Sequence, residues 1–165
     1  MIEREFFSTV AAVARSEEFE MLCRYRHHLH STVYGHSLRV AYLCYRHAKK
    51  FGLKIDTGCL VRGAMLHDYY LYDRTDKLTS PRLHWLRHPR YALKNALTKY
   101  PDLSAQERDM ILRHMFPLTF IPPRTKAGWL ICFYDKVAAV GDLFGKPHRT
   151  SLAASRPQNS MTDTR

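Results

Sequence analysis

Apolar positions recur with the spacing of an α-helix along most of the chain. In residues 3–29, Phe6, Phe7, Val10 and Val13 fall on one side, which predicts one or two helices. The same spacing predicts further helices in segments 31–52, 56–73, 88–101, 104–116 and 126–145. Because no segment keeps the alternation of a half-buried strand, we expect an all-α fold, a compact bundle of about six to seven helices.

Polar caps and prolines mark where these helices begin and end. Proline suits the first turn of a helix, so Pro89 predicts a helix start beside His88, and Pro101 ends that helix. Ser104 and Glu107 have the spacing of a capping box. The other expected boundaries are N-caps at Ser31 or Thr32 and at Asp56 or Thr57, a helix end at Gly52, and loops at 73–82 and 117–125.

Several polar side chains fall on the apolar faces of these predicted helices. His36 shares a face with Val33 and Val40, and the adjacent residues His67 and Asp68 fall on two adjoining apolar faces of their helix, so that both point inward. The same test places three further side chains inward or at a helix mouth: His88, His114 and Asp135. A carboxylate in an apolar interior is costly unless it is paired or binds a metal, and histidine with aspartate suits a divalent cation. Any one such histidine is more often a hydrogen-bonded core residue or an N-cap than a metal ligand, and for the whole set the pattern alone leaves both interpretations open.

The bulk composition narrows the class of protein. A chain of 165 residues with 45% hydrophobic residues is long enough for one domain with a substantial core. No apolar run is long enough for a membrane span, and the N-terminal segment mixes acidic residues into its apolar face, unlike a secretory signal. Four cysteines lie far apart with no CxxC pair, which favours reduced thiols and a cytoplasmic location. The formal charge of +11 favours anionic partners, although it is also consistent with a merely basic surface.

The order of the inward polar residues then adds a resemblance. His36 in "HSLRVA", the His67-Asp68 pair, His88 in "RHPRYALKNA", His114 in "ILRHMFPLT" and Asp135 in "FYDKVAAV" together resemble the HD-domain superfamily of metal-dependent phosphohydrolases. The likeness extends roughly over residues 31–143. The segments "HPRYALKNA" and "HMFPLTFIPP" are similar to small bacterial HD proteins in particular. No Gly-Tyr-Pro follows His114, so cleavage of cyclic dinucleotides is not expected.

The resemblance implies which residues bind metal. His36, His67, Asp68 and Asp135 match the ligands of a first metal ion, and His88 and His114 match those of a second. It further implies a pair of divalent ions (Fe, Mn, Ni, Zn or Mg) bridged by Asp68, with His67 and Asp68 serving to activate a water molecule. The expected domains are an N-terminal helical extension packed on the core (1–30), the HD domain (31–145) and a flexible basic tail (146–165).

The implied reaction is hydrolysis of a phosphomonoester or phosphodiester in a phosphorylated small molecule or nucleotide. Arg39, Lys77 and Arg124 are candidate phosphate contacts, and His84, one turn before His88, is a candidate alternative ligand or substrate contact. Two other classes stay open: a di-iron oxygenase with the same ligand pattern, and a non-catalytic HD domain that binds nucleotide or nucleic acid. The sequence favours nucleic acid less than a small anion, because its basic residues are dispersed. It gives no oligomeric state.

Overall fold

The computed structural model describes residues 2–28, 31–76, 78 and 80–144, and across them the predicted all-α fold is confirmed. The predicted tail, residues 146–165, lies outside this part of the chain. No helix in the described part is long and apolar enough to cross a bilayer. The helices are α1 (Ile2–Ala14), α2 (Glu17–Leu22), α3 (Val33–Lys50), α4 (Thr57–Leu66), α5 (His84–Lys99), α6 (Ala105–Arg113) and α7 (Lys126–Phe144).

Three of the predicted helix starts have the expected caps. The Thr32 hydroxyl accepts a hydrogen bond from the backbone N–H of Gly35 at the start of α3, and Asp56 accepts one from the N–H of Cys59 at the start of α4. At α6, Ser104 and Glu107 form the reciprocal capping box. These bonds satisfy backbone donors that have no partner within the helix itself.

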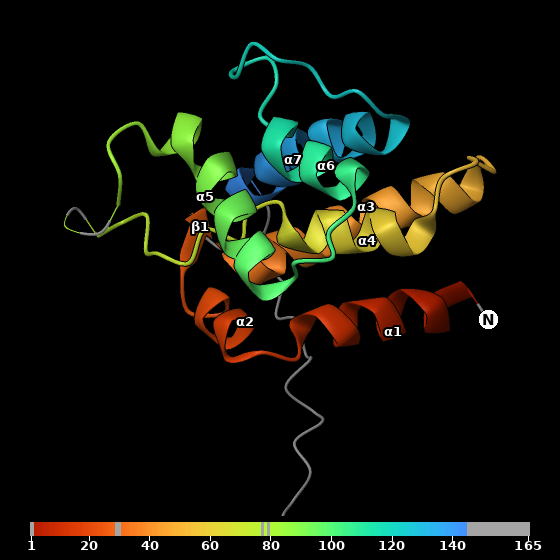
Figure 1. The fold of residues 1–165 in the computed structure, drawn as a ribbon, viewed down its shortest axis with the longest axis horizontal. Coiled ribbons are helices and arrows are strands. Elements are labelled where there is room, and N and C mark those ends of the chain that lie inside the picture. The colour runs from red at the N-terminus through yellow and green to blue at the C-terminus, as the bar shows by residue number, and fades with distance from the viewer. Residues whose placement is uncertain (1, 29–30, 77, 79, 145–165) are drawn as a thin grey trace, which may run out of the picture.

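The segment before α3 differs from the prediction, because residues 26–28 form a strand rather than the end of a helix. This strand, β1 (Arg26–His28), pairs antiparallel with β2 (Ser31–Thr32). Helix α2 ends at Leu22, and the segment "CRYRHH" that follows has too few apolar residues at helical spacing to bury a helix face. The hairpin brings β1 beside α3 and α7 (Figure 1).

Two predicted boundaries also shift along the chain. Helix α5 begins at His84, one turn before the start that Pro89 suggested, so His88 lies within the helix and not at its mouth. Pro89 has no N–H to donate to the carbonyl of Trp85, while the side chain of His88 hydrogen-bonds to the carbonyl of His84. Helix α4 ends at Leu66, well short of residue 73, and the chain turns at residues 67–68 directly after it.

The helices pack in three layers around one core. Figure 1 shows α1 and α2 on one side, α3 and α4 in the middle, and α6 and α7 on the other side, with α5 at the flank. Gly63 allows α4 and α6 to approach closely, since an added Cβ would lie 2.5 Å from the terminal carbon of Met110. The close approach brings the chain just after α4 near the chain just after α6.

Candidate metal centre

The six predicted ligands converge from five separate segments of the chain on one buried cluster. His36 lies on α3, His88 on α5 and Asp135 on α7, whereas the other three side chains lie just past helix ends, after α4 and α6. Each side chain is nearly inaccessible to water, the most exposed being Asp135 at 7%. The buried members are His36, His67, Asp68, His88, His114 and Asp135.

One side of the cluster, which we call the carboxylate-rich half, contains His36, His67, Asp135 and Asp142. The Nε2 atom of His36 lies 3.0 Å from Oδ1 of Asp135, and its Nδ1 lies 3.0 Å from Oδ2 of Asp142. The Nε2 atom of His67 lies 3.6 Å from the same oxygen of Asp135. Both imidazoles therefore point at one carboxylate oxygen.

The other side, which we call the histidine-rich half, contains His88 and His114. Their Nε2 atoms lie 2.9 Å apart. The Nδ1 atom of His114 lies 2.8 Å from the carbonyl oxygen of Ile111, and that of His88 lies 3.1 Å from the carbonyl of His84. Because a carbonyl only accepts, each Nδ1 carries a proton and donates it, so that in the neutral form of either ring the lone pair lies on Nε2.

Two lone pairs facing each other at 2.9 Å need a proton or a cation between them. Nitrogen ligands bind zinc at about 2.0–2.1 Å in tetrahedral geometry, so two of them around one ion lie about 3.3–3.4 Å apart, and an ion would need to separate these two nitrogens by only about 0.5 Å. The separation of these two nitrogens therefore fits shared coordination of a single ion. His67 has the same arrangement, since its Nδ1 lies 2.7 Å from the carbonyl of Ala64 and its Nε2 faces the cluster.

Asp68 lies between the two halves. Its Oδ1 is 3.2 Å from Nε2 of His88 and 3.6 Å from Nε2 of His114, while its Oδ2 is 3.6 Å from Nε2 of His67. Burial alone would raise the pKa of Asp68, but the charge of His67 and the adjacent imidazoles of His27 and His88 hold it well below its usual range. The carboxylate is thus ionised at neutral pH and turned toward both halves.

The two halves have opposite effects on their histidines. Burial disfavours the charged form of His36, but hydrogen bonds to Asp135 and Asp142 raise its pKa to about 9. Burial likewise disfavours charged His67, and the charge of Asp68 raises its pKa. In the histidine-rich half, burial and the charges of His67 and His88 lower the pKa of His114 to about 3.

Neighbouring residues fix the segments that carry the cluster. Asn95, within the "HPRYALKNA" segment, donates from its side chain to the carbonyl of Tyr69, the residue after Asp68. The Nζ atom of Lys136 donates to the carbonyl of His114 at 2.8 Å, which ties the end of α6 to α7. These bonds hold the ligand-bearing turns in place from separate helices.

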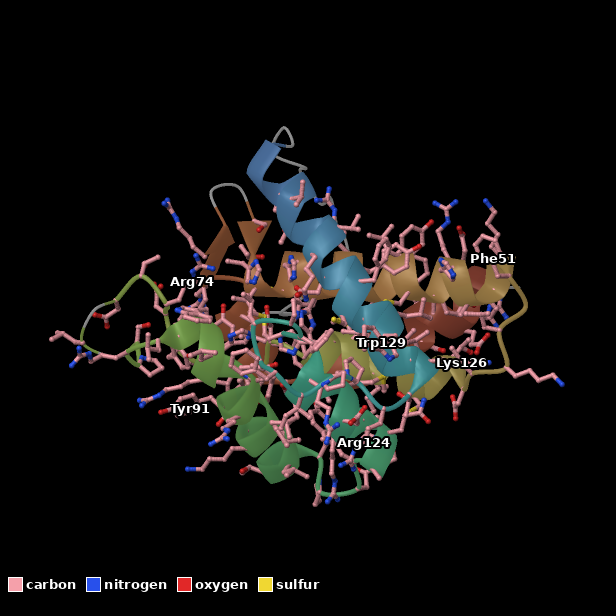
Figure 2. All side chains as sticks on the ribbon, turned by 90° about the horizontal axis from the view of Figure 1, so that it is seen from above. Phe51, Arg74, Tyr91, Arg124, Lys126 and Trp129 are labelled. Carbon is pink, nitrogen blue, oxygen red and sulfur yellow. The ribbon has the colours of Figure 1, made fainter. Side chains whose placement is uncertain are left out.

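The candidate phosphate contacts are placed differently. Arg39, 37% exposed, forms an ion pair with Asp142 at the edge of the carboxylate-rich half. Arg124 is exposed near the N-terminal end of α7 (Figure 2), and α7 rises roughly 14 Å between its first residue and Asp135, so Arg124 does not join the cluster. Lys77 lies outside the described residues.

His84, the candidate alternative ligand, contacts the cluster without joining a group that could hold metal. Its ring stacks on His88 with centroids 4.9 Å apart, and its Nδ1 lies 2.8 Å from the hydroxyl of Tyr72. Burial and the charge of His88 lower the pKa of His84 to about 4, so its ring is neutral at pH 7. The structure therefore places His84 beside the histidine-rich half, behind His88.

Two residues of the cluster were missed by sequence reasoning. His27, on β1, has its Nε2 2.9 Å from Oδ2 of Asp68. The segment around it was predicted as helix, so its histidines were not weighed. Asp142, seven residues after Asp135 on α7, was given no role. Two sequence signals could have identified it. Asp142 follows Asp135 by seven residues, which places both on one helix face, and Arg39, three residues after His36, offers a cation to pair with a second carboxylate.

The donors of the cluster fit a bound divalent metal. Nε2 of His67 and Oδ1 of Asp68 are both buried, and neither makes a hydrogen bond of ordinary geometry within the described part of the chain. Three overlapping groups offer ligand atoms within 4.8 Å of one another: His27, His36 and Asp68; His36, His67 and Asp135; and His67, Asp68 and His114. Neutral imidazole with carboxylate suits Zn, Fe, Mn or Ni, while the nitrogen-rich half is less suited to Mg.

Comparison with known proteins gives one family. The HD domain family matches residues 33–138, well over half of the chain. No curated protein and no solved structure shows significant similarity. The matched region contains all six predicted ligands, whereas His27 and Asp142 lie outside it.

Proposed function

Because the chain belongs to the HD domain family, we propose that it is a metal-dependent phosphohydrolase. The proposed substrate is a phosphomonoester or phosphodiester, nucleotide-like in its chemistry. The observation that carries the proposal is the convergence of three histidines and two carboxylates on one buried cluster. Two of the ligand atoms in it, Nε2 of His67 and Oδ1 of Asp68, are buried and make no hydrogen bond of ordinary geometry within the described part of the chain. Such a set is costly to bury unless a cation binds it.

Each half of the centre is suited to one ion. His36, His67 and Asp135 would hold the first, His88 and His114 the second, and Asp68 both. Two divalent ions bound there would lower the pKa of a water molecule toward neutrality and stabilise negative charge on phosphoryl oxygens. The contribution of the chain is to orient the ligands, with three Nδ1 atoms held by backbone carbonyls and that of His36 by Asp142.

The remaining side chains agree with a water nucleophile rather than a protein nucleophile. Burial raises the pKa of the Cys44 thiol and of the Cys132 thiol, so both are protonated at pH 7 and poorly nucleophilic. Among the candidate cations, Arg39 lies at the edge of the centre, and we propose it as the phosphate contact through its partly exposed guanidinium.

The proposal is tested on the purified chain by measuring bound metals and hydrolysis of a generic phosphomonoester and phosphodiester before and after chelation. We expect chelation to abolish hydrolysis and re-addition of a divalent metal to restore it. Asp68→Ala should lose both metal and activity, because Asp68 faces both halves, whereas His47→Ala, which removes a histidine bonded to the hydroxyl of Tyr134, should keep both. Full activity in protein shown to be free of metal would refute the proposal.

The same assay separates the two other classes left open by the sequence. Iron with consumption of oxygen, and no hydrolysis under anaerobic conditions, would indicate an HD-type oxygenase. Binding of nucleotide or nucleic acid that weakens steeply with salt, without any turnover, would indicate a binding domain. Hydrolysis under anaerobic conditions supports the phosphohydrolase.

A further inference from the structure

His27 reaches the centre from outside the region that matches the HD domain. It lies on β1, six residues before that region begins, and it is 8% exposed. Its Nε2 atom is 2.9 Å from Oδ2 of Asp68, the oxygen that also faces Nε2 of His67 at 3.6 Å. One oxygen of Asp68 therefore has imidazole nitrogens from both the hairpin and the turn after α4 beside it.

The contact of His27 resembles that of a predicted ligand. Nε2 of His36 lies 3.0 Å from Oδ1 of Asp135, which is the same kind of contact at nearly the same distance. The rings of His27 and His36 stack with centroids 3.9 Å apart and planes inclined by 20°. His27, His36 and Asp68 offer ligand atoms within 4.8 Å of one another, as close as the other two candidate groups.

We propose that His27 is a seventh metal ligand, which binds through Nε2 the ion shared with Asp68 in the carboxylate-rich half. This inference rests on the metal centre of the proposed function, but not on its reaction. A neutral imidazole beside an ionised carboxylate is a donor pair that Zn, Fe, Mn and Ni accept. The N-terminal hairpin then completes a centre whose other six ligands come from the HD domain.

The competing role for His27 is to donate a hydrogen bond to Asp68 and no more. Glutamine separates the two roles, because its amide N–H can still reach a carboxylate while it is a much poorer metal ligand than imidazole. His47→Ala is the matched control, since His47 also lies on the core side of α3 but bonds to Tyr134 rather than to the centre.

The experiment titrates metal-free protein with Co²⁺, whose visible absorption reports the number and geometry of its ligands, in competition with a chelator. For His27→Ala and His27→Gln alike we expect Co²⁺ affinity at one site to fall by more than about 100-fold, above the 10–100-fold typical of outer-shell partners. The absorption of that site should also change. His47→Ala should match the unsubstituted protein.

Unchanged affinity and absorption in His27→Gln would overturn the inference and leave His27 as a hydrogen-bond donor. Should both variants fail to fold, a structure of the unsubstituted protein with bound metal decides the matter. Nε2 of His27 at about 2.0–2.3 Å from an ion supports ligation, and a separation beyond about 3 Å contradicts it. Protein that binds metal without hydrolysing phosphoesters refutes the proposed function while leaving this measurement intact.

Discussion

The two halves of the centre both contain buried histidines, but the pKa values of these histidines are shifted in opposite directions. In the carboxylate-rich half, Asp135 and Asp142 overcome the effect of burial and raise the pKa of His36 to about 9, so that in metal-free protein its imidazole is charged at pH 7. In the histidine-rich half, burial and nearby positive charge lower the pKa of His114 to about 3. That ring is neutral at the same pH.

The difference decides what each half must do to bind an ion. Metal ligands must be deprotonated, so an ion entering the carboxylate-rich half displaces a proton from His36. An ion entering the histidine-rich half finds His114 already neutral, with its Nδ1 held by the carbonyl of Ile111 and its Nε2 lone pair in place. Carboxylates thus supply charge to the first half at the cost of competition from protons, and the second half avoids that competition but depends on Asp68 for its negative charge.

Removing Asp68 should abolish the distinction between the halves, because its two oxygens face both of them. We expect Asp68→Asn to lose both metal ions and to lower phosphoester hydrolysis by at least the order of 10³-fold, more than the loss of one transition-state donor costs. Metal content and turnover rate measure the effect. Asp102→Asn, which removes an exposed partner of Arg62, is the charge-matched control and should behave normally.

Single-half variants should separate the two ions. We expect His36→Ala to lose the ion of the carboxylate-rich half and His88→Ala to lose that of the histidine-rich half, each retaining about one ion per chain. Hydrolysis should fall on the order of 10²-fold or more in both, because each half would hold an ion that stabilises charge during phosphoryl transfer. Loss of both ions from either variant would show that the halves are one cooperative site.

The stability of metal-free protein should respond to pH differently on the two sides of pH 6.5. The pKa of His36 is raised from 6.5 to about 9, so its contribution is complete below pH 6.5 and is lost as pH rises to about 9. The loss is roughly 3 kcal/mol. The pKa of His114 is lowered to about 3, so its neutral ring costs stability as pH falls from 6.5 toward 3.

Metal-free protein should therefore be most stable near pH 6–7, as measured by denaturant unfolding in the presence of chelator. In His36→Gln the alkaline decline should flatten while the acidic decline persists, which assigns each limb to its half. His47→Ala should keep both limbs. An unfolding free energy that stays constant between pH 6.5 and 9 in the unsubstituted protein would contradict the charged state of His36.

Helical periodicity predicted the fold and the inward direction of the polar residues, because both depend on spacing within one element. It placed His36, Asp135 and the His67-Asp68 pair on core faces, and all are buried. It could not predict which distant side chains meet, since that depends on packing between helices. His27 was missed for this reason: its position follows from a short hairpin, and its neighbour in space is 41 residues away in sequence.

Local signals also failed where tertiary contacts decided the outcome. Pro89 predicted a helix start, yet α5 begins one turn earlier, at His84. The extra turn stacks His84 on His88 and supplies the carbonyl that fixes the tautomer of His88. The turn of helix that Pro89 did not predict is therefore the turn that orients His88 in the histidine-rich half.

The smallest expected effect is that of Asp142→Asn on metal affinity, which tests whether the carboxylate-rich half depends on a residue outside the matched HD region. Asp142 contacts Nδ1 of His36 at 3.0 Å and is itself paired with Arg39, so it orients the imidazole and favours its charge. Asp142→Asn should weaken metal affinity in this half by about 10–100-fold and leave the ion at His88 and His114 unchanged. Since replacing the carboxylate by an amide also lowers the pKa of His36, part of the loss should be regained at low pH, where competition from protons is strongest in the unsubstituted protein. Metal affinity measured at pH 6 and at pH 8 therefore distinguishes the two contributions of Asp142. An equal loss of affinity at both pH values indicates that Asp142 only orients His36. A smaller loss at pH 6 indicates that Asp142 also raises the pKa of His36.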